Sequence, residues 1–261
     1  MNNDKPIISI KDLRVSYGDH EVLKGINLEV YGGQIIGYIG TNGAGKSTTV
    51  KTLLGIIPEY SGTVEIFGKD IRQSGIDYKK RIGYIPEVAD IYDNLTAREY
   101  LTFIGEVYGL EYEKADEKAH KLMGLFQIQD AYNSRISSFS KGMKQKVLII
   151  ASLIHNPDVL FLDEPLSGLD ANSVMIFKEI LTELSNQGKT IFYSSHIMDV
   201  VEKISTRILL LNNGVVAADG SFEELKNKSQ EGSLEEIFNQ LTGFNSYKEL
   251  AEGFVSVIEE V

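Results

Sequence analysis

The first quarter of the chain alternates apolar and polar residues at every second position, which is the pattern of strands with one buried face. The segments that alternate in this way are "IISIKDLRVSYG" (7–18), "INLEVYGG" (26–33) and "GTVEIFGKDI" (62–71). Half-buried strands of this kind are typical of antiparallel sheets. The pattern therefore predicts an antiparallel β subdomain at the N-terminus.

From about residue 92 to residue 156 the apolar spacing becomes helical. Thr96 and Glu99 form a capping-box pattern ahead of "YLTFIGEVYGL" (100–110), which is a helix-start signal. The charged segment "EYEKADEKAHKLMGLF" (111–126) follows with the spacing of an amphipathic helix. This region is predicted to be a helical insertion.

Short apolar runs before and after this insertion have the continuous apolar pattern of buried parallel strands. They are "QIIGYIG" (34–40), "RIGYI" (81–85), "VLFLDE" (159–164), "TIFYSS" (190–195) and "RILLLNNG" (207–214), with helices expected at 46–55, 141–156, 171–187 and 198–204. Strands that alternate with helices indicate a parallel sheet with crossover helices. We predict an α/β core over 1–91 and 157–220, a helical subdomain over 92–156, and a short helical tail over 221–261.

Composition limits what kind of protein this is. The 261 residues carry a net charge of −11, which opposes nonspecific binding to nucleic acid, and contain no cysteine for disulfides or thiolate metal sites. The N-terminus lacks the basic start and apolar stretch of a signal peptide, and the longest apolar run, 147–154, is far shorter than the ~20 residues that cross a bilayer. We expect a cytosolic protein that spans no membrane and binds no nucleic acid.

Residues 40–47 match G-x-x-x-x-G-K-S between a predicted strand and a predicted helix. Glycines allow the backbone N–H groups of such a loop to converge on phosphate oxygens, and the helix N-terminus attracts the same anion. Lys46 is placed to reach the outer phosphates and Ser47 to bind Mg²⁺. The pattern predicts a P-loop nucleotide site, with a kinase, a GTPase and an ATPase still open, formed by Gly40, Thr41, Asn42, Gly43, Ala44, Gly45, Lys46, Ser47 and Thr48.

Two other apolar strands end in polar side chains that belong at the same sheet edge. Asp163 ends the first, and a buried carboxylate there needs a partner such as Mg²⁺ coordinated through water. Glu164 points elsewhere and is the candidate general base for an attacking water. His196 follows the second strand, where its imidazole could hydrogen-bond a γ-phosphate.

The stretch "SSFSKGMKQKVLIIASLIHNPDVLFLDEPLSGLD" (137–170) resembles the signature region, acidic strand and following loop of the ATP-binding cassette (ABC) ATPases. The resemblance covers about residues 7–220, with six motifs in order. It implies that ATP and Mg²⁺ are bound and that His196 is the family's switch histidine. It also implies that Tyr17 stacks on adenine, and that Ser140 and Gly142 meet the γ-phosphate of ATP held by a second ATPase subunit.

The same resemblance implies that the chain docks on transmembrane permease subunits at the cytoplasmic face of the membrane. Its partner ATPase subunit would be an identical copy or a close paralogue. Lys141, Lys144 and Lys146 lie in the first turns of the signature helix, where they would oppose the helix dipole unless a bound polyanion faced that helix end. For Lys144 and Lys146 we expect extension into water instead.

The chain departs from the family pattern at three positions. Lys141 and Met143 replace a glycine and a glutamine of the signature, and Glu87 replaces a glutamine that touches Mg²⁺ and the attacking water. An ionised glutamate accepts hydrogen bonds but donates none, so Glu87 is a candidate metal ligand with Ser47 and Asp163. These departures look like the branch that exports drugs, peptides and antibiotics. An importer ATPase, or a soluble ABC ATPase of DNA repair or translation, is the alternative.

Overall fold

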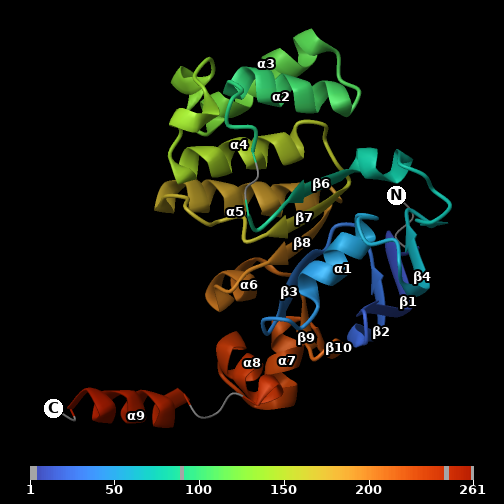
Figure 1. The fold of residues 1–261 in the computed structure, drawn as a ribbon, viewed down its shortest axis with the longest axis vertical. Helices are drawn as coiled ribbons and strands as arrows, with labels where there is room; N and C mark the ends of the chain where they lie inside the picture. The colour runs from blue at the N-terminus through green and yellow to red at the C-terminus, as the bar shows by residue number, and fades with distance from the viewer. Residues whose placement is uncertain (1–4, 89–90, 244–246, 260–261) are drawn as a thin grey trace.

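An antiparallel four-stranded sheet forms the N-terminal part of the computed structural model, which describes residues 5–88, 91–243 and 247–259 (Figure 1). The strand order is β2-β1-β4-β5, with Ile8 of β1 opposite Val30 of β2 and Ile66 of β4. The predicted antiparallel subdomain is confirmed. Its strands are β1 (Ile8–Tyr17), β2 (His20–Val30), β4 (Ser61–Ile66) and β5 (Lys69–Asp70).

A second sheet of six strands lies beside it in the order β10-β9-β3-β8-β7-β6. All of its neighbouring pairs are parallel except β9 with β10, which is the expected mostly parallel sheet. The strands are β3 (Ile35–Gly40), β6 (Ile82–Ile85), β7 (Val159–Asp163), β8 (Thr190–Ser194), β9 (Arg207–Asn212) and β10 (Val215–Gly220).

Side chains of the six-stranded sheet alternate between its two faces and pack into two hydrophobic cores, one on each face. Ile36, Phe161 and Phe192 face the antiparallel sheet and α1, whereas Leu160 and Tyr193 face the other helices. Both faces are covered, as parallel sheets require, which explains why the strands read as continuous apolar runs. The covering helices are α1 (Lys46–Leu53), α4 (Lys141–Leu153), α5 (Ala171–Asn186) and α6 (Met198–Ile204).

Helices fill the chain between β6 and β7, as the periodicity predicts, and lie at one end of the molecule (Figure 1). The Thr96–Glu99 capping box is formed at the start of α2 (Ala97–Val107). Arg98 of α2 donates two hydrogen bonds, of 2.8 and 2.9 Å, to Asp116 of α3 (Tyr112–Leu125). These contacts hold α2 and α3 together, while the exact division of the chain at 91/92 and 156/157 stays a prediction.

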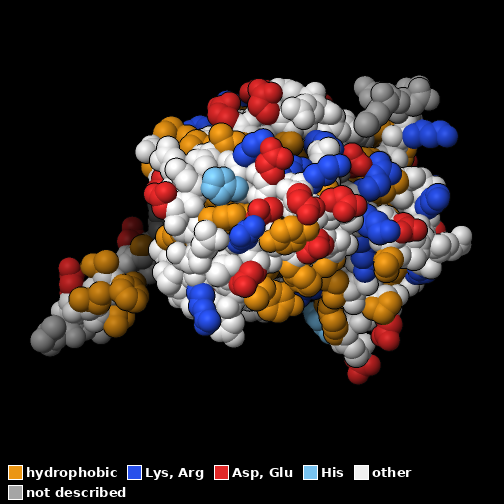
Figure 2. Space-filling view, turned by 90° about the horizontal axis from the view of Figure 1, so that it is seen from above, with side chains coloured by type: hydrophobic (Ala, Val, Ile, Leu, Met, Phe, Trp, Pro, Cys, Tyr) orange, Lys and Arg blue, Asp and Glu red, His pale blue; other side chains and the backbone are white. Residues whose placement is uncertain are grey.

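Three helices follow β10. Capping boxes at Ser221 and Ser233 begin α7 (Phe222–Ser229) and α8 (Leu234–Thr242). The third helix, α9 (Tyr247–Glu259), projects from the body and shows hydrophobic side chains on its surface (Figure 2). Phe254 of this helix is 70% exposed. Within the described ranges, no helix is both long and apolar enough to span a bilayer.

Gly40, the first glycine of the phosphate loop, is required by close packing rather than by its φ angle. A Cβ there would lie 2.4 Å from the carbonyl oxygen of Leu211 in β9. We expect Gly40→Ala to lower the free energy of unfolding by about 1–3 kcal/mol, the usual cost of overpacking, as measured by urea denaturation. Gly124→Ala is the control, because a Cβ at Gly124 in α3 would lie 3.9 Å from the Gln129 side chain, and this variant should gain about 0.5–1 kcal/mol. A neutral Gly40→Ala variant would contradict the packing argument.

Candidate functional site

The phosphate loop joins β3 to α1 and is held in shape by its own residues. Gly43 and Gly45 have φ angles of 77° and 107°, in the left-handed region that favours glycine. The Thr49 hydroxyl donates to the Gly45 carbonyl (3.0 Å) and accepts from the buried Tyr38 hydroxyl (2.9 Å). These bonds fix the first turn of α1, whose N–H groups face the loop. The loop is therefore preorganised to bind an anion.

Lys46 begins α1 and lies across this loop. Its Nζ donates to the carbonyl oxygens of Gly40 (2.6 Å) and Thr41 (3.2 Å). Burial lowers the pKa of Lys46, and the negative charges of Asp163 and Glu164 oppose that change. These two acceptors are uncharged, so the positive charge of Lys46 stays available for phosphate oxygens.

Asp163 lies where β7 ends, on the sheet face that carries Phe161 and meets α1. Burial raises its pKa, a hydrogen bond from Ser194 lowers it, and the charges of Glu87 and Glu164 raise it again. The ionised carboxylate is thus held in a site that disfavours it. A cation bound there would remove that cost.

Glu164 follows Asp163 with a left-handed backbone, at a φ of 48°. A non-glycine residue in this region costs about 1–3 kcal/mol and is commonest at functional sites. The Glu164 N–H donates to the Ser194 carbonyl (3.0 Å), and the Glu164 carboxylate accepts from the His196 N–H (2.6 Å) and the Ser195 hydroxyl (3.2 Å). The His196 ring Nε2 lies 3.7 Å from the same carboxylate. Residues of the turn after β8 therefore hold the Glu164 carboxylate through hydrogen bonds.

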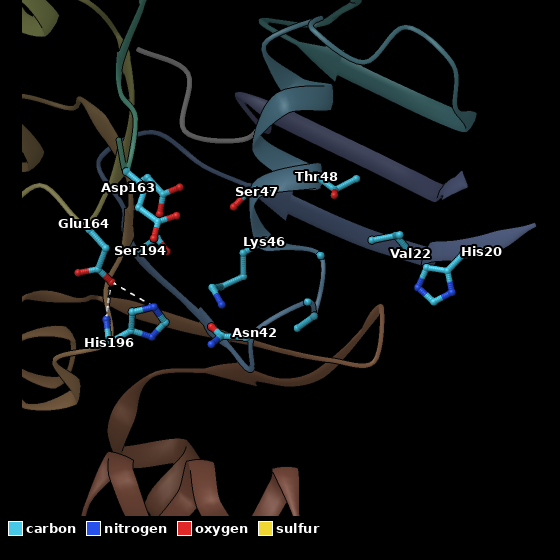
Figure 3. Close-up of a pocket in the computed structure, with 14 residues that line it drawn as sticks. His20, Val22, Asn42, Lys46, Ser47, Thr48, Asp163, Glu164, Ser194 and His196 are labelled. Atoms are coloured by element: carbon cyan, nitrogen blue, oxygen red, sulfur yellow. Dashed lines mark hydrogen bonds and ion pairs between the residues drawn. The ribbon is translucent and has the colours of Figure 1, made fainter. Parts of the chain in front are cut away.

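One cavity of about 400 Å³ collects most of the predicted site (Figure 3). Lys46 and Ser47 lie between Asp163 and Glu164 on one side and β2 on the other (Figure 3). The lining residues are His20, Val22, Asn42, Gly43, Ala44, Gly45, Lys46, Ser47, Thr48, Glu87, Asp163, Glu164, Ser194 and His196. The site is a groove open to solvent between the phosphate loop and the ends of β7 and β8.

Some expected residues do not line this cavity, and some lining residues were not expected. Tyr17, Gly40, Thr41, Ser140 and Gly142 are outside the described lining. Tyr17 ends β1 opposite His20 and is 53% exposed. Three lining residues are not among the predicted site residues. The alternating strand pattern does not mark His20 and Val22, whereas Ser194 lies at the end of an apolar strand, which is a usable signal.

Ser140 caps α4 and accepts a hydrogen bond from the Met143 N–H (3.2 Å). Gly142 lies so close to the next loop that an added Cβ would be 2.6 Å from the Gly168 carbonyl oxygen. The glycine at 142 is thus explained by packing inside this chain. Gln145 strengthens the contact, since its Nε2 donates to the Pro165 carbonyl (2.9 Å). The first turns of α4 are tied to residues 165–168, directly after Glu164.

The prediction that Lys144 and Lys146 extend into water is wrong. Lys144 pairs with Asp93 at 2.9 Å, and Lys146 pairs with Asp170 at 3.3 Å. Their partners come from the segment before α2 and from the N-cap of α5, which the local sequence around α4 does not contain. Tertiary ion pairs therefore offset the unfavourable helix dipole.

The family model described as ABC transporter matches residues 23–167, more than half of the chain. The chain belongs to the ABC transporter family. An ABC transporter ATP-binding protein of Methanocaldococcus jannaschii is 39% identical over 224 residues, covering 86% of this chain and 81% of the relative. The bacitracin transport ATP-binding protein BcrA of Bacillus licheniformis is 35% identical over 225 residues, covering 86% and 72%.

A solved structure, described as the ATP binding subunit of an ABC transporter, matches with a TM-score of 0.85 and 32% identity. It covers 90% of this chain, which in turn covers 99% of that structure's chain. The protein is an ATP-binding subunit of an ABC transporter, and it is an ATPase. The expected fold, family and enzyme class are confirmed. In other systems such subunits pair with membrane permease components.

Asp163→Asn should stabilise this ABC protein without nucleotide while removing its activity. The asparagine has no charge to bury beside Glu87 and Glu164. A gain of about 1 kcal/mol would raise the Tm by roughly 2–4 °C for a chain of this size, as measured by thermal melting. The exposed Asp130→Asn is the matched control, and its Tm should hardly move. A Tm equal to or below wild type would contradict the buried-charge argument.

Proposed function

We propose that this ABC protein is the ATP-hydrolysing subunit of a membrane exporter that works as a dimer with Mg²⁺. The observation that carries the proposal is the convergence of Lys46, Asp163, Glu164 and His196 on one cavity beside a preorganised phosphate loop. A cation, a candidate base and an anion-binding helix end are the parts that phosphoryl transfer to water requires.

Each side chain has a separate role in this proposal. Lys46 and the loop N–H groups bind the β- and γ-phosphates, as the N-terminus of α1 favours. Glu164 orients the attacking water and accepts its proton, while the half-exposed His196 donates a hydrogen bond to the γ-phosphate. Tyr17 stacks its exposed ring on adenine, next to His20 at the same end of the β1–β2 hairpin.

Mg²⁺ is proposed to bind through Ser47, Asp163 and Glu87. These residues fit the ion, because the half-buried Asp163 lies near the like charges of Glu87 and Glu164, and Ser47 lines the same cavity. Among the described residues no three acidic or histidine side chains form a metal cluster by themselves, and at nucleotide sites phosphate oxygens complete the Mg²⁺ shell. The ion would neutralise charge on the phosphates, and Glu87 would serve as an acceptor only.

The base role of Glu164 is tested by Glu164→Gln. We expect ATP hydrolysis to fall by about 10²–10⁴-fold, the usual weight of a positioned base, while ATP affinity persists because the phosphate loop is intact. ATP turnover and nucleotide binding should both be measured with purified protein. Near-normal turnover would remove Glu164 from the role. Residual hydrolysis should not recover in the presence of the membrane partner.

The dimer is supported by where the signature residues lie. The described residues that line the cavity include none from 137–156. Ser140 nevertheless caps the N-terminus of α4, and a helix N-terminus attracts anions. A second chain would bring that helix end to the γ-phosphate when the dimer closes. Lys46 and Ser140 of one chain would then serve different ATP molecules.

A mixed dimer tests this arrangement. Lys46→Ala and Ser140→Arg should each be nearly inactive alone, but in a heterodimer both lesions fall in one composite site and the other site is intact. We expect tagged, isolated heterodimers to recover up to about half of wild-type ATP hydrolysis if the sites are independent. ATP-dependent heterodimer formation is the control. Full hydrolysis by a strict monomer would contradict the shared site.

Export is proposed because the chain is similar to a bacitracin transport protein along most of its length. The permease surface would be the helical subdomain and the Glu87 loop, where Val88, Tyr92, Phe103 and Val107 are exposed apolar residues. The protein would be peripheral at the cytoplasmic face, with an identical or paralogous ATPase partner and no nucleic acid. Cells that express it with its permease should tolerate more bacitracin than cells with Glu164→Gln, and equal tolerance would count against this substrate class.

A further inference from the structure

Two neighbouring strands of the sheet each end in a pair of polar residues. β7 ends at Asp163 and is followed by Glu164, and β8 ends at Ser194 and is followed by Ser195. The strands are in parallel register, with Asp163 level with Ser194. Glu164 turns away from the strand direction through its left-handed backbone, and its carboxylate lies beside Ser195 instead of Ser194. Each serine is therefore next to one of the two acids.

Ser194 lies beside Asp163. It is paired with Asp163 across the two strands, on the sheet face of Phe192 and Phe161, and its hydroxyl lowers the pKa of Asp163. Ser194 also lines the nucleotide cavity, whereas Ser195 does not. The two serines thus differ in which acid they contact and in whether they reach the cavity.

Ser195 contacts Glu164. Its Oγ lies 3.2 Å from Glu164 Oε2, and the same Oγ accepts a hydrogen bond from the Ile197 N–H at 3.2 Å. A serine hydroxyl has one proton. With a lone pair engaged by Ile197, that proton is free to be donated to Glu164. Ser195 is only 4% exposed, so water does not readily replace it as a donor.

The Glu164 carboxylate consequently has one fixed donor on each oxygen. The His196 N–H holds Oε1 at 2.6 Å, and the Ser195 hydroxyl holds Oε2. One donor on each oxygen defines the plane of the carboxylate, which a single donor would leave free to turn. The His196 N–H belongs to the backbone and remains whatever side chain occupies 195.

We propose that Ser195 is a positioning residue that sets the orientation of the Glu164 carboxylate for hydrolysis. The proposal rests on the base role of Glu164 given above. Ser195 touches neither nucleotide nor water in it. Its hydroxyl acts through Glu164, and the left-handed backbone of Glu164, held by the Ser194 carbonyl, stays in place without it.

The single variants separate orientation from binding. Ser195→Ala should lower kcat by about 10–100-fold, the usual effect of removing a partner that orients a functional side chain, with KM and ATP affinity nearly unchanged. Ser195→Thr keeps the hydroxyl and should restore most of kcat. A general defect in folding would instead lower the Tm and the affinity of both variants. Equal loss in the Thr and Ala variants, or a loss of affinity in place of kcat, would overturn the proposal.

The double variant tests whether Ser195 acts through Glu164. Ser195→Ala combined with Glu164→Gln should be no slower than Glu164→Gln alone, because the group being oriented is already lost. An additional tenfold loss would mean that Ser195 acts elsewhere and would overturn the proposal. If Glu164→Gln is inactive while Ser195→Ala is fully active, only the positioning role fails. If Glu164→Gln remains active, the base role fails, and the positioning role fails with it.

Discussion

The parallel register of β3, β8 and β7 is the constraint on which the site depends. It sets the carboxyl ends of three strands at one edge, so that the phosphate loop, Asp163 and the turn after Ser194 meet. The two cores on either face hold this register, because a slip of one residue would move every buried side chain to the wrong face. Packing far from the site therefore positions the chemistry.

The same sheet edge contains charged and strained groups that lower the stability of the fold, and the packing of the two cores must offset this loss. Asp163 is half-buried near two other carboxylates, Lys46 loses hydration, and Glu164 takes a strained left-handed backbone. Charged groups in such a site are disfavoured without an opposite charge. A nucleotide with its cation would supply charges of both signs, so the charged groups of the site would be stabilised most when a nucleotide is bound. Instability without ligand is thus linked to affinity for ligand.

The helical subdomain is joined to this edge through α4. The contact of Gly142 with Gly168, the bond from Gln145 to Pro165 and the Lys146–Asp170 pair bind its first turns to the loop after Glu164. A movement of α4 would therefore move this loop as well. The coupling lies within one chain and involves residues directly after the proposed base. It offers a physical route from the helices proposed to dock on a permease to the proposed hydrolysis site.

Local patterns in the sequence determined the elements, the phosphate loop with Lys46, and the acidic strand end, because strand alternation, capping boxes and glycine spacing depend only on near neighbours. Contacts between distant segments needed the tertiary structure. Lys144 and Lys146 find acids 51 and 24 positions away, Gly40 is required by a carbonyl of β9, and Ser195 reaches Glu164 only because β8 lies beside β7. Such pairings follow from strand order and register, which the chain sets only when its two cores are packed together.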